Sequence, residues 1–256
     1  IISQALVATI EQDRAMARRV IDRVLQFIDG PIRQGHATFG HDLALSALAY
    51  DLCFERWTDA ERERFLVYFN RTVDANVSSE TAVFHNGWYG YKNWGIGLAG
   101  YASYHENPRS PAIVQALDED FRQRAAPALE RAGQGGGWAE GYYVHYWLYE
   151  WLFFCEVARR CAGVDYYALA PGFFGERAVA SMFEMYPGIR DNRSRRPVPM
   201  GDGGGRTFGG DRDKALSARR ILVNYFRADP AHQAVHAYNE VTPRTSVGNY
   251  AYMDLL

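Results

Sequence analysis

The sequence has few cysteines and no clustered set of metal ligands. Cys53, Cys155 and Cys161 are its three cysteines among 256 residues. Cys155 and Cys161 are six residues apart on one expected helix and lie on different faces, so we expect no disulfide between them. The apolar surroundings of Cys53 and Cys155 predict buried thiols. No pair of cysteines has zinc-site spacing, and we predict no metal and no cofactor.

An excess of charge of one sign is also lacking. The chain has 28 Lys and Arg against 30 Asp and Glu, a net charge of −2, so no global basic field favours nucleic acid. Residues 190–196 form one local basic cluster, which is either a solvated loop or a patch facing an acidic polymer. No apolar run has membrane-spanning length, so we predict no membrane partner. The sequence begins without Met inside an expected helix, and we interpret it as a fragment of a longer protein.

Strand patterns are missing, whereas helical periodicity is frequent. Gly30 and Pro31 should end the first helix, and Thr58 with Glu61 forms a capping box that should start the third. We expect helices over residues 5–28, 41–56, 58–76, 93–104, 111–132, 141–162, 172–186, 211–227 and 230–240.

The burial pattern of these helices alternates. Segments 41–56 and 93–104 are apolar nearly all round, whereas 58–76 and 111–132 are amphipathic. An inner ring of buried helices and an outer ring of half-exposed ones would produce this alternation. We therefore predict an all-α fold, an incomplete (α/α) toroid of antiparallel helix hairpins that forms one domain over residues 1–256. The long loops 77–92, 133–140 and 187–210 should lie on one face, where a cleft would form.

Aromatic residues are abundant, at 14% of the chain, and several lie beside glycines in the segment 84–94. Apolar sugar faces stack on aromatic rings, so Trp88, Tyr89 and Trp94 are either core residues or a sugar platform. Asn93 is either a helix N-cap or an amide donor to a substrate carboxylate. His85, in the same segment, is a candidate substrate contact.

A second aromatic segment, residues 135–147, begins with glycines and enters the expected helix 141–162. Tyr143 and Tyr146 are three residues apart and should share one face near the helix N-terminus. The helix dipole there favours an anion, including a phenolate. The alternative is an inner helix that is simply rich in aromatics, with Glu140 charging its first turn.

A third glycine-rich segment covers residues 199–206. It lacks the Lys-Ser/Thr of a P-loop and follows no strand, so we exclude nucleotide binding. A structural turn is the default interpretation, and Asp202 or Arg206 is a candidate to point into the cleft.

Three segments together resemble the heparinase II/III-like superfamily of polysaccharide lyases. Residues 48–52 and 58–62 are similar to the family's "ALAYDWLY…LTPEER" helix pair. Residues 92–99 are similar to its "NNW…G…LA" helix, and residues 137–141 with the later tyrosine pair resemble "GxWxEG…YxxY". The resemblance is close over residues 40–165 and loose elsewhere. It implies an α/α toroid followed by β-sandwich domains, which this sequence lacks.

The resemblance also implies a secreted or periplasmic enzyme whose substrate is an acidic polysaccharide. It implies that this enzyme cleaves the polysaccharide by β-elimination at a uronic acid. Asn93 matches the asparagine that neutralises the carboxylate. Tyr143 is the expected proton-transferring tyrosine, with Tyr146 in reserve. The family's catalytic histidine often comes from a later part of the fold, which we expect to lie outside this fragment. Within the sequence, His145, Lys92 and Arg206 are the candidate neighbours that would activate the tyrosine. In this chain the spacing from Glu140 to the tyrosines is one or two residues shorter than in the family. The expected substrate contacts are His85, Trp88, Tyr89, Trp94, Trp138, Glu140, Asp202 and Arg206.

Two other functions fit the same fold. An inverting glycoside hydrolase would use Glu140 and Asp202 as acid and base, with their carboxyl groups roughly 6.5–9.5 Å apart. A non-catalytic carbohydrate-binding toroid would need neither. Under the lyase interpretation we expect Asn93, Trp88 and Tyr143 to line one cleft.

Overall fold

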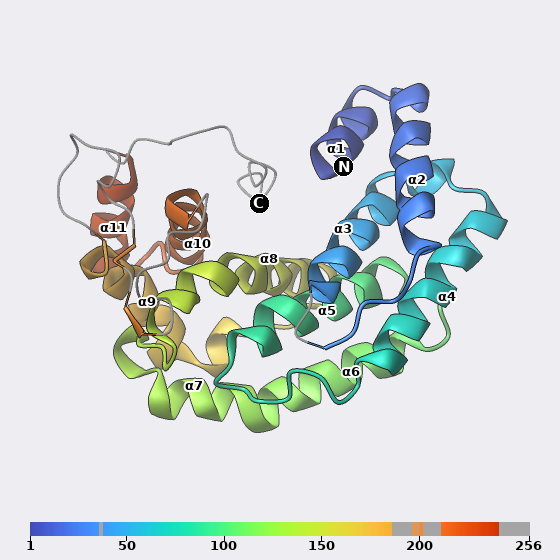
Figure 1. The fold of residues 1–256 in the computed structure, drawn as a ribbon. Coiled ribbons are helices and arrows are strands. Elements are labelled where there is room, and N and C mark those ends of the chain that lie inside the picture. Colours follow the sequence, from blue (N-terminus) through green and yellow to red (C-terminus); the bar gives the residue numbers. More distant parts are fainter. Residues whose placement is uncertain (36–37, 186–196, 199, 202–210, 241–256) are drawn as a thin grey trace. The chain divides into compact units, whose positions relative to one another are not determined.

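The computed structural model describes residues 1–35, 38–185, 197–198, 200–201 and 211–240 (Figure 1). Over these ranges the ordered backbone is helical, and pairing between extended segments is limited to one isolated bridge, Met185 with Pro197. The all-α class predicted from the sequence is therefore confirmed for the described part of the chain.

Two compact units divide the chain. Unit 1 comprises Ile1–Thr81 and Gly90–Glu119, and unit 2 comprises Ala82–Tyr89 and Asp120–Leu256. The chain passes between the units at residues 81–82, 89–90 and 119–120. Whether they form the single toroidal domain expected from the sequence stays a prediction.

Unit 1 contains the helices α1 to α5 and most of α6. Their bounds are α1 Ile2–Ile10, α2 Arg14–Ile28, α3 Phe39–Leu52, α4 Asp59–Ala75, α5 Trp94–Ala102 and α6 Ser110–Asp120, with a short 3-10 turn, η1, at Phe54–Arg56. The predicted capping box starts α4: Thr58 Oγ1 accepts a hydrogen bond from Glu61 N, and the Glu61 carboxylate accepts one from Thr58 N. Helices α3 and α5 lie side by side (Figure 1).

Glycines allow this close contact between α3 and α5. A Cβ added to Gly95 would lie 2.7 Å from the Gly40 Cα and closer still to the Gly40 carbonyl. A Cβ added to Gly40 would in turn overlap the backbone of Tyr91 and Lys92. Both helices are buried on nearly all sides, as the sequence predicted for this pair.

Unit 2 is centred on the long helix α8, Val144–Ala162, whose buried face carries Trp147, Trp151 and Phe154. A π-helical segment, η3 (Phe121–Ala125), and α7 (Ala126–Ala132) precede it, together with the 3-10 turns η4 (Gln134–Gly136) and η5 (Gly141–Tyr143). Further along the chain, α9 covers Pro171–Phe183, α10 covers Asp211–Tyr225 and α11 covers Pro230–Glu240. Helix α10 lies against α8 and α9, and α11 packs on α10 and α9 (Figure 1).

The structure corrects two element predictions. The first expected helix, 5–28, is broken into α1 and α2, because Gln12 adopts a left-handed φ of 56° and the Asp13 side chain caps α2 through Met16 N. The expected loop 77–92 ends early, because Gly87–Asn93 forms a π-helical segment, η2, that leads directly into α5.

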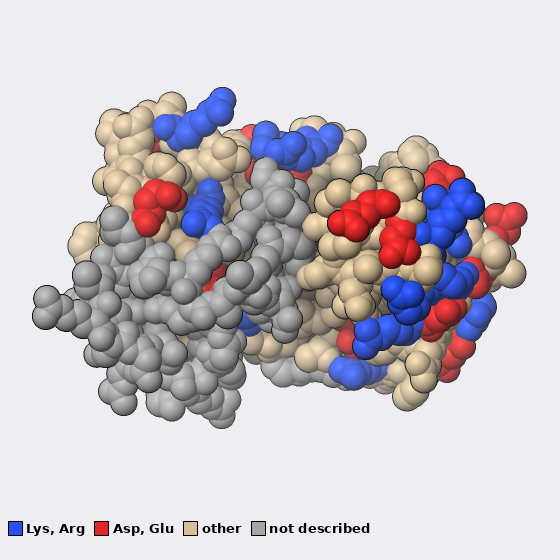
Figure 2. Space-filling model, turned by 90° about the horizontal axis from the view of Figure 1, so that it is seen from above, with Lys and Arg blue, Asp and Glu red and all other residues tan. Residues whose placement is uncertain are grey.

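Acidic and basic residues are interspersed over the helices α2 and α4, and Figure 2 shows charges of both signs mixed on the right of its view. They include the ion pair of Arg18 with Glu61 at 2.9 Å and that of Arg64 with Asp29. Within the part of the chain that the structure describes, no helix is long and apolar enough to cross a membrane.

Candidate functional site

The carboxylate of Glu140 joins two of the segments that the sequence singled out. Its Oε2 accepts hydrogen bonds from Asn86 N at 2.6 Å and from Trp138 Nε1 at 3.1 Å, and its Oε1 accepts one from Asn86 Nδ2 at 3.1 Å. Asn86 and Glu140 are 54 residues apart in the chain, and both belong to unit 2. The carboxylate side chain is 12% exposed.

His85 completes this cluster and is its most exposed member, at 38% of its side chain. Its Nδ1 accepts a hydrogen bond from Gly87 N at 3.0 Å, so the proton of a neutral imidazole belongs on Nε2. Nε2 lies 3.6 Å from Glu140 Oε1. The structure thus brings together three predicted substrate contacts, His85, Trp138 and Glu140, and adds Asn86, which the sequence argument did not select.

Gly141 fixes the backbone that follows Glu140. It has a left-handed φ of 60°, and a Cβ there would lie 2.7 Å from the Met200 carbonyl oxygen. That carbonyl accepts a hydrogen bond from the next amide, Tyr142 N, at 2.9 Å. The glycine after Glu140 therefore lets the chain turn sharply into η5 and α8.

Tyr143 and Tyr146 lie at the N-terminal end of α8 as a pair. Their ring centroids are 6.4 Å apart and the rings are nearly perpendicular, and both side chains are half-buried. The prediction that they share one helix face is therefore confirmed. Their position at a helix N-terminus favours negative charge nearby.

A buried cation from α10 accompanies the second of these rings. Lys214 is only 4% exposed, and its Nζ lies 4.2 Å from the ring centroid of Tyr146 and 5.2 Å from that of Tyr149. An ammonium over an aromatic face is attracted to the ring, and here it places a positive charge next to the phenol of Tyr146. Lys214 is 68 residues beyond Tyr146, so no local sequence signal could have linked them.

His145 lies inside unit 2, tied to a carboxylate and an arginine. Its Nε2 is 2.9 Å from Glu184 Oε2, and the buried Arg177 also pairs with Glu184 and donates to the Gly136 carbonyl. Burial lowers the pKa of His145 to about 4, although the hydrogen bond that it donates to Glu184 acts in the opposite direction. Burial alone would raise the pKa of Glu184, but its hydrogen bond with His145 and the charge of Arg177 lower it to about 2.

These values make His145 neutral and Glu184 ionised at neutral pH. The imidazole therefore donates from Nε2 to the carboxylate and holds the start of α8 against the residue that ends α9. His145 is 4% exposed, and its hydrogen bond to Glu184 positions the first turn of α8.

Asn93 and Lys92 lie in unit 1. Asn93 is 5% exposed, and its side chain makes no N-cap hydrogen bond, because η2 already continues into α5. Its Nδ2 has no hydrogen-bond partner among the described residues. Lys92 Nζ donates to the carbonyls of Ser79 and Val77, at 2.7 and 3.2 Å. Of the cleft expected around Asn93, Trp88 and Tyr143, the structure places Trp88 in the core, at 1% exposure, and a cleft shared by Asn93 and Tyr143 stays a prediction.

The three rings considered for a sugar platform are core residues in the structure. Trp88 and Tyr89 pack on Trp151, and the Tyr89 ring stacks on Trp147 with centroids 4.2 Å apart. Trp88, Tyr89 and Trp94 are each at most 1% exposed. The cause is the π-helical segment η2, which turns Trp88 and Tyr89 inward where the sequence suggested an open loop.

Asp202 and Arg206 lie outside the described residues. His232 and His236 on α11 have the His-x-x-x-His spacing that is typical of zinc ligands on a helix. His232 is buried against Phe226, whereas His236 is exposed. Among the residues that the structure describes, no group of three His, Cys, Asp or Glu side chains could hold a metal ion.

Comparison with protein-family models, with curated proteins and with solved structures found no match for this chain.

Proposed function

We propose that the chain is the catalytic (α/α)-toroid part of a secreted or periplasmic polysaccharide lyase that cleaves uronic-acid-containing polysaccharides by β-elimination. The single observation that carries this is the pair of half-buried phenols, Tyr143 and Tyr146, at the N-terminal end of α8, with the buried Lys214 ammonium over the ring of Tyr146. A phenol has a pKa of about 10 and is a poor base at neutral pH. Positive charge and a helix N-terminus are the neighbours that favour its anion.

In the proposed reaction Tyr143 removes the proton at C5 of the uronic acid. The C5–H electron pair becomes the C4–C5 double bond, the bond from C4 to the leaving oxygen breaks, and that oxygen takes a proton from the tyrosine. In the family that the sequence resembles, an asparagine hydrogen bonds the carboxylate as that group gains negative charge, and Asn93 is the residue that matches it. A buried Nδ2 without an acceptor among the described residues is suited to such a ligand.

The Glu140 cluster would hold the substrate-facing segments in place. Three hydrogen bonds fix Glu140 to Asn86 and Trp138 and leave His85 as the half-exposed member. His85 is therefore the member of this cluster that we propose contacts the substrate.

An elimination assay on a panel of uronate polymers, with the full-length protein, tests this function. A lyase produces an unsaturated ring that absorbs in the ultraviolet, together with one new reducing end per cleavage. New reducing ends without ultraviolet absorbance would replace the lyase with an inverting hydrolase that uses Glu140. Binding to the polymers with neither product would indicate a carbohydrate-binding scaffold.

A further inference from the structure

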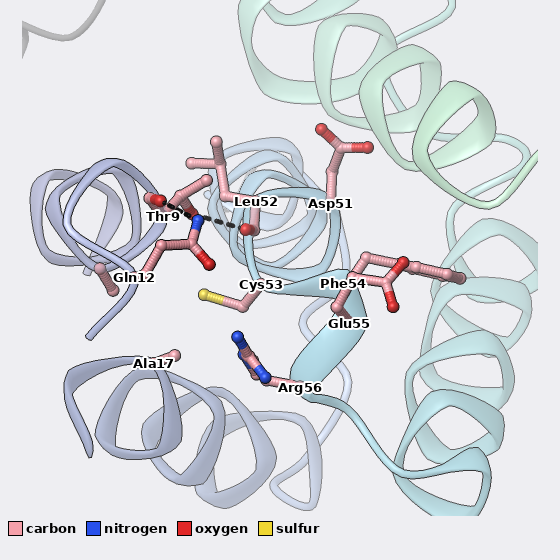
Figure 3. A pocket seen from close by; sticks show the side chains of 10 residues that line it. Thr9, Gln12, Ala17, Asp51, Leu52, Cys53, Phe54, Glu55 and Arg56 are labelled. Atoms are coloured by element: carbon pink, nitrogen blue, oxygen red, sulfur yellow. Dashed lines mark hydrogen bonds between the residues drawn. The ribbon is translucent and has the colours of Figure 1, made fainter. Parts of the chain in front are cut away.

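Unit 1 contains a pocket of about 300 Å³ whose lining includes none of the candidate site residues discussed above. It lies where α1 and α2 meet the C-terminal end of α3 and the turn η1 (Figure 3). This volume is at the lower bound of small-molecule sites, roughly 300–1,000 Å³. A polysaccharide chain is therefore too large for it, and a small molecule is the fitting occupant. The lining residues are Ala8, Thr9, Gln12, Ala17, Asp51, Leu52, Cys53, Phe54, Glu55 and Arg56.

The inner wall of the pocket is apolar and small. Ala8, Ala17 and Cys53 are each at most 4% exposed. Figure 3 shows the Ala17 methyl group and the Cys53 sulfur directed into the space between the helices. Burial raises the pKa of the Cys53 thiol, so this group is neutral and weakly polar. The wall therefore suits a short apolar group.

One cation faces this wall. The Arg56 guanidinium is directed toward Cys53 and Gln12, whereas the carboxylates of Asp51 and Glu55 are directed away from it (Figure 3). No described residue forms a hydrogen bond or an ion pair with the Arg56 side chain. A guanidinium carries five donors in a planar fork that matches a carboxylate, and here the fork is unused by the described protein groups.

Gln12 supplies the opposite rim and is held there by the break between α1 and α2. Its left-handed φ of 56° is uncommon for a residue with a side chain, and its Nε2 donates to Thr9 O at 2.8 Å. Thr9 Oγ1 in turn donates to Leu52 O at 2.6 Å, which joins α1 to the end of α3. These bonds fix the mouth of the pocket without using Arg56.

We propose that this pocket binds a small monocarboxylate, with the carboxylate on the Arg56 guanidinium and a short apolar chain against Ala8, Ala17 and Cys53. The charges of the lining favour a monoanion over a dianion. Asp51 and Glu55 both repel an anion bound to Arg56, and the repulsion on a doubly charged anion such as phosphate is twice that on a monocarboxylate.

Butyrate is a suitable probe, with butyramide as its neutral isostere and inorganic phosphate as the other anion. Saturation-transfer NMR on the 256-residue chain should show saturable butyrate binding that Arg56→Gln weakens at least about tenfold, because a charge-assisted pair is lost. Glu55→Gln, a charge change on the same turn, should leave butyrate binding unchanged or slightly tighter. Butyramide and phosphate should not compete.

The reactivity of the Cys53 thiol provides a second test of binding, which uses the protein without any substitution. Butyrate should slow the alkylation of Cys53 by iodoacetamide, followed by peptide mass spectrometry, at the concentration that half-saturates the NMR signal. The exposed Cys161 should react at the same rate with and without butyrate. Equal binding of butyramide would show that the pocket is an apolar cavity in which Arg56 does not contribute to binding. Competition by phosphate would show that the pocket binds anions without selectivity. Either result, or no saturation and no protection of Cys53, overturns the proposal.

Discussion

At the scale of single residues, the two phenols at the start of α8 differ in their surroundings. Tyr143 precedes the first residue of α8, whereas Tyr146 lies inside the first turn with the Lys214 ammonium over its ring. The two rings touch only edge to face. Removing either hydroxyl therefore leaves the packing of both rings in place.

We predict that Tyr143→Phe abolishes elimination in the full-length protein and leaves the melting temperature unchanged. The hydroxyl that moves the proton is lost, whereas the edge-to-face packing of the ring on Tyr146 is kept. Tyr146→Phe is the matched control and should be milder. Initial rates of ultraviolet product formation measure both. Loss of activity in Tyr146→Phe alone would move the proton transfer by one turn to the ring beside Lys214. Full activity in both variants would contradict elimination by this pair.

We predict that Glu140→Gln lowers the free energy of unfolding by about 1–3 kcal/mol, since it leaves a buried donor without an acceptor. Three donors converge on the carboxylate, from Asn86 N, Asn86 Nδ2 and Trp138 Nε1. A glutamine amide has one oxygen and must turn its NH₂ group toward one of them. Urea unfolding measures the change, with Glu63→Gln on the exposed side of α4 as a neutral control. Loss of activity at unchanged stability would instead favour the hydrolase.

At the scale of elements, local signals in the sequence were enough to find most helices. The capping box of Thr58 and Glu61, the stop at Gly30 and the apolar periodicity of 141–162 each act within a few residues, and the structure has helices there. The break between α1 and α2 at Gln12 could not be predicted, because no glycine or proline lies there. It depends on the Asp13 cap and on packing of α1 against α2 and α3.

Contacts between distant segments were beyond the reach of the sequence. Nothing near Asn86 indicates that Glu140 will accept from it, and nothing near Tyr146 indicates Lys214. The glycines at 87 and 90 predicted an open loop, yet the two aromatic residues between them, Trp88 and Tyr89, are buried when η2 forms. Burial of large rings outweighed the cost of glycine in a helix, about 1 kcal/mol per residue.

The link between α8 and α9 gives a prediction about pH. His145 has a folded pKa of about 4, below its ordinary 6.5, so the unfolded chain binds a proton first as the pH falls. Glu184, at about 2 against an ordinary 4.5, acts in the same direction at lower pH. The contribution of these two groups to the free energy of unfolding should thus be fully present above pH 6.5 and should decline progressively as the pH falls below 6.5.

The variant His145→Gln isolates the histidine's part. A glutamine amide can still donate to Glu184 but does not titrate, so the decline between pH 6.5 and 4 should flatten, while the decline below 4.5 remains. Melting temperatures from pH 7.5 to 4 in both proteins measure this. An identical slope in the two proteins would show that His145 is not the group responsible.

At the scale of the whole molecule, the two units share segments of chain. The π-helical segment η2 holds Tyr89, assigned to unit 2, and Gly90, assigned to unit 1. Trp88 and Tyr89 are buried within unit 2, while the same segment leads into α5 of unit 1. Unfolding of unit 1 would therefore release the chain that carries two core rings of unit 2, and we expect one cooperative transition.

Gly95→Ala tests this expectation from unit 1. The added methyl overlaps the backbone of Gly40, so α3 and α5 must separate, at a cost of about 1–3 kcal/mol. Far-ultraviolet circular dichroism follows all helices, whereas tryptophan fluorescence reports mainly on unit 2, which holds Trp88, Trp138, Trp147 and Trp151. With coupled units, both signals shift to lower urea together.

Gly175→Ala on α9 is the matched control for the glycine change. Its Cβ would meet only Phe226 Cε1, at 4.0 Å, so the substitution gains helix propensity without overlap and should stabilise by about 0.5–1 kcal/mol. Because the gain arises in unit 2, coupling carries it to the whole transition, and both signals should move to higher urea. A fluorescence midpoint that ignores Gly95→Ala while the dichroism transition splits into two steps would mean that the units unfold independently, despite the segment they share.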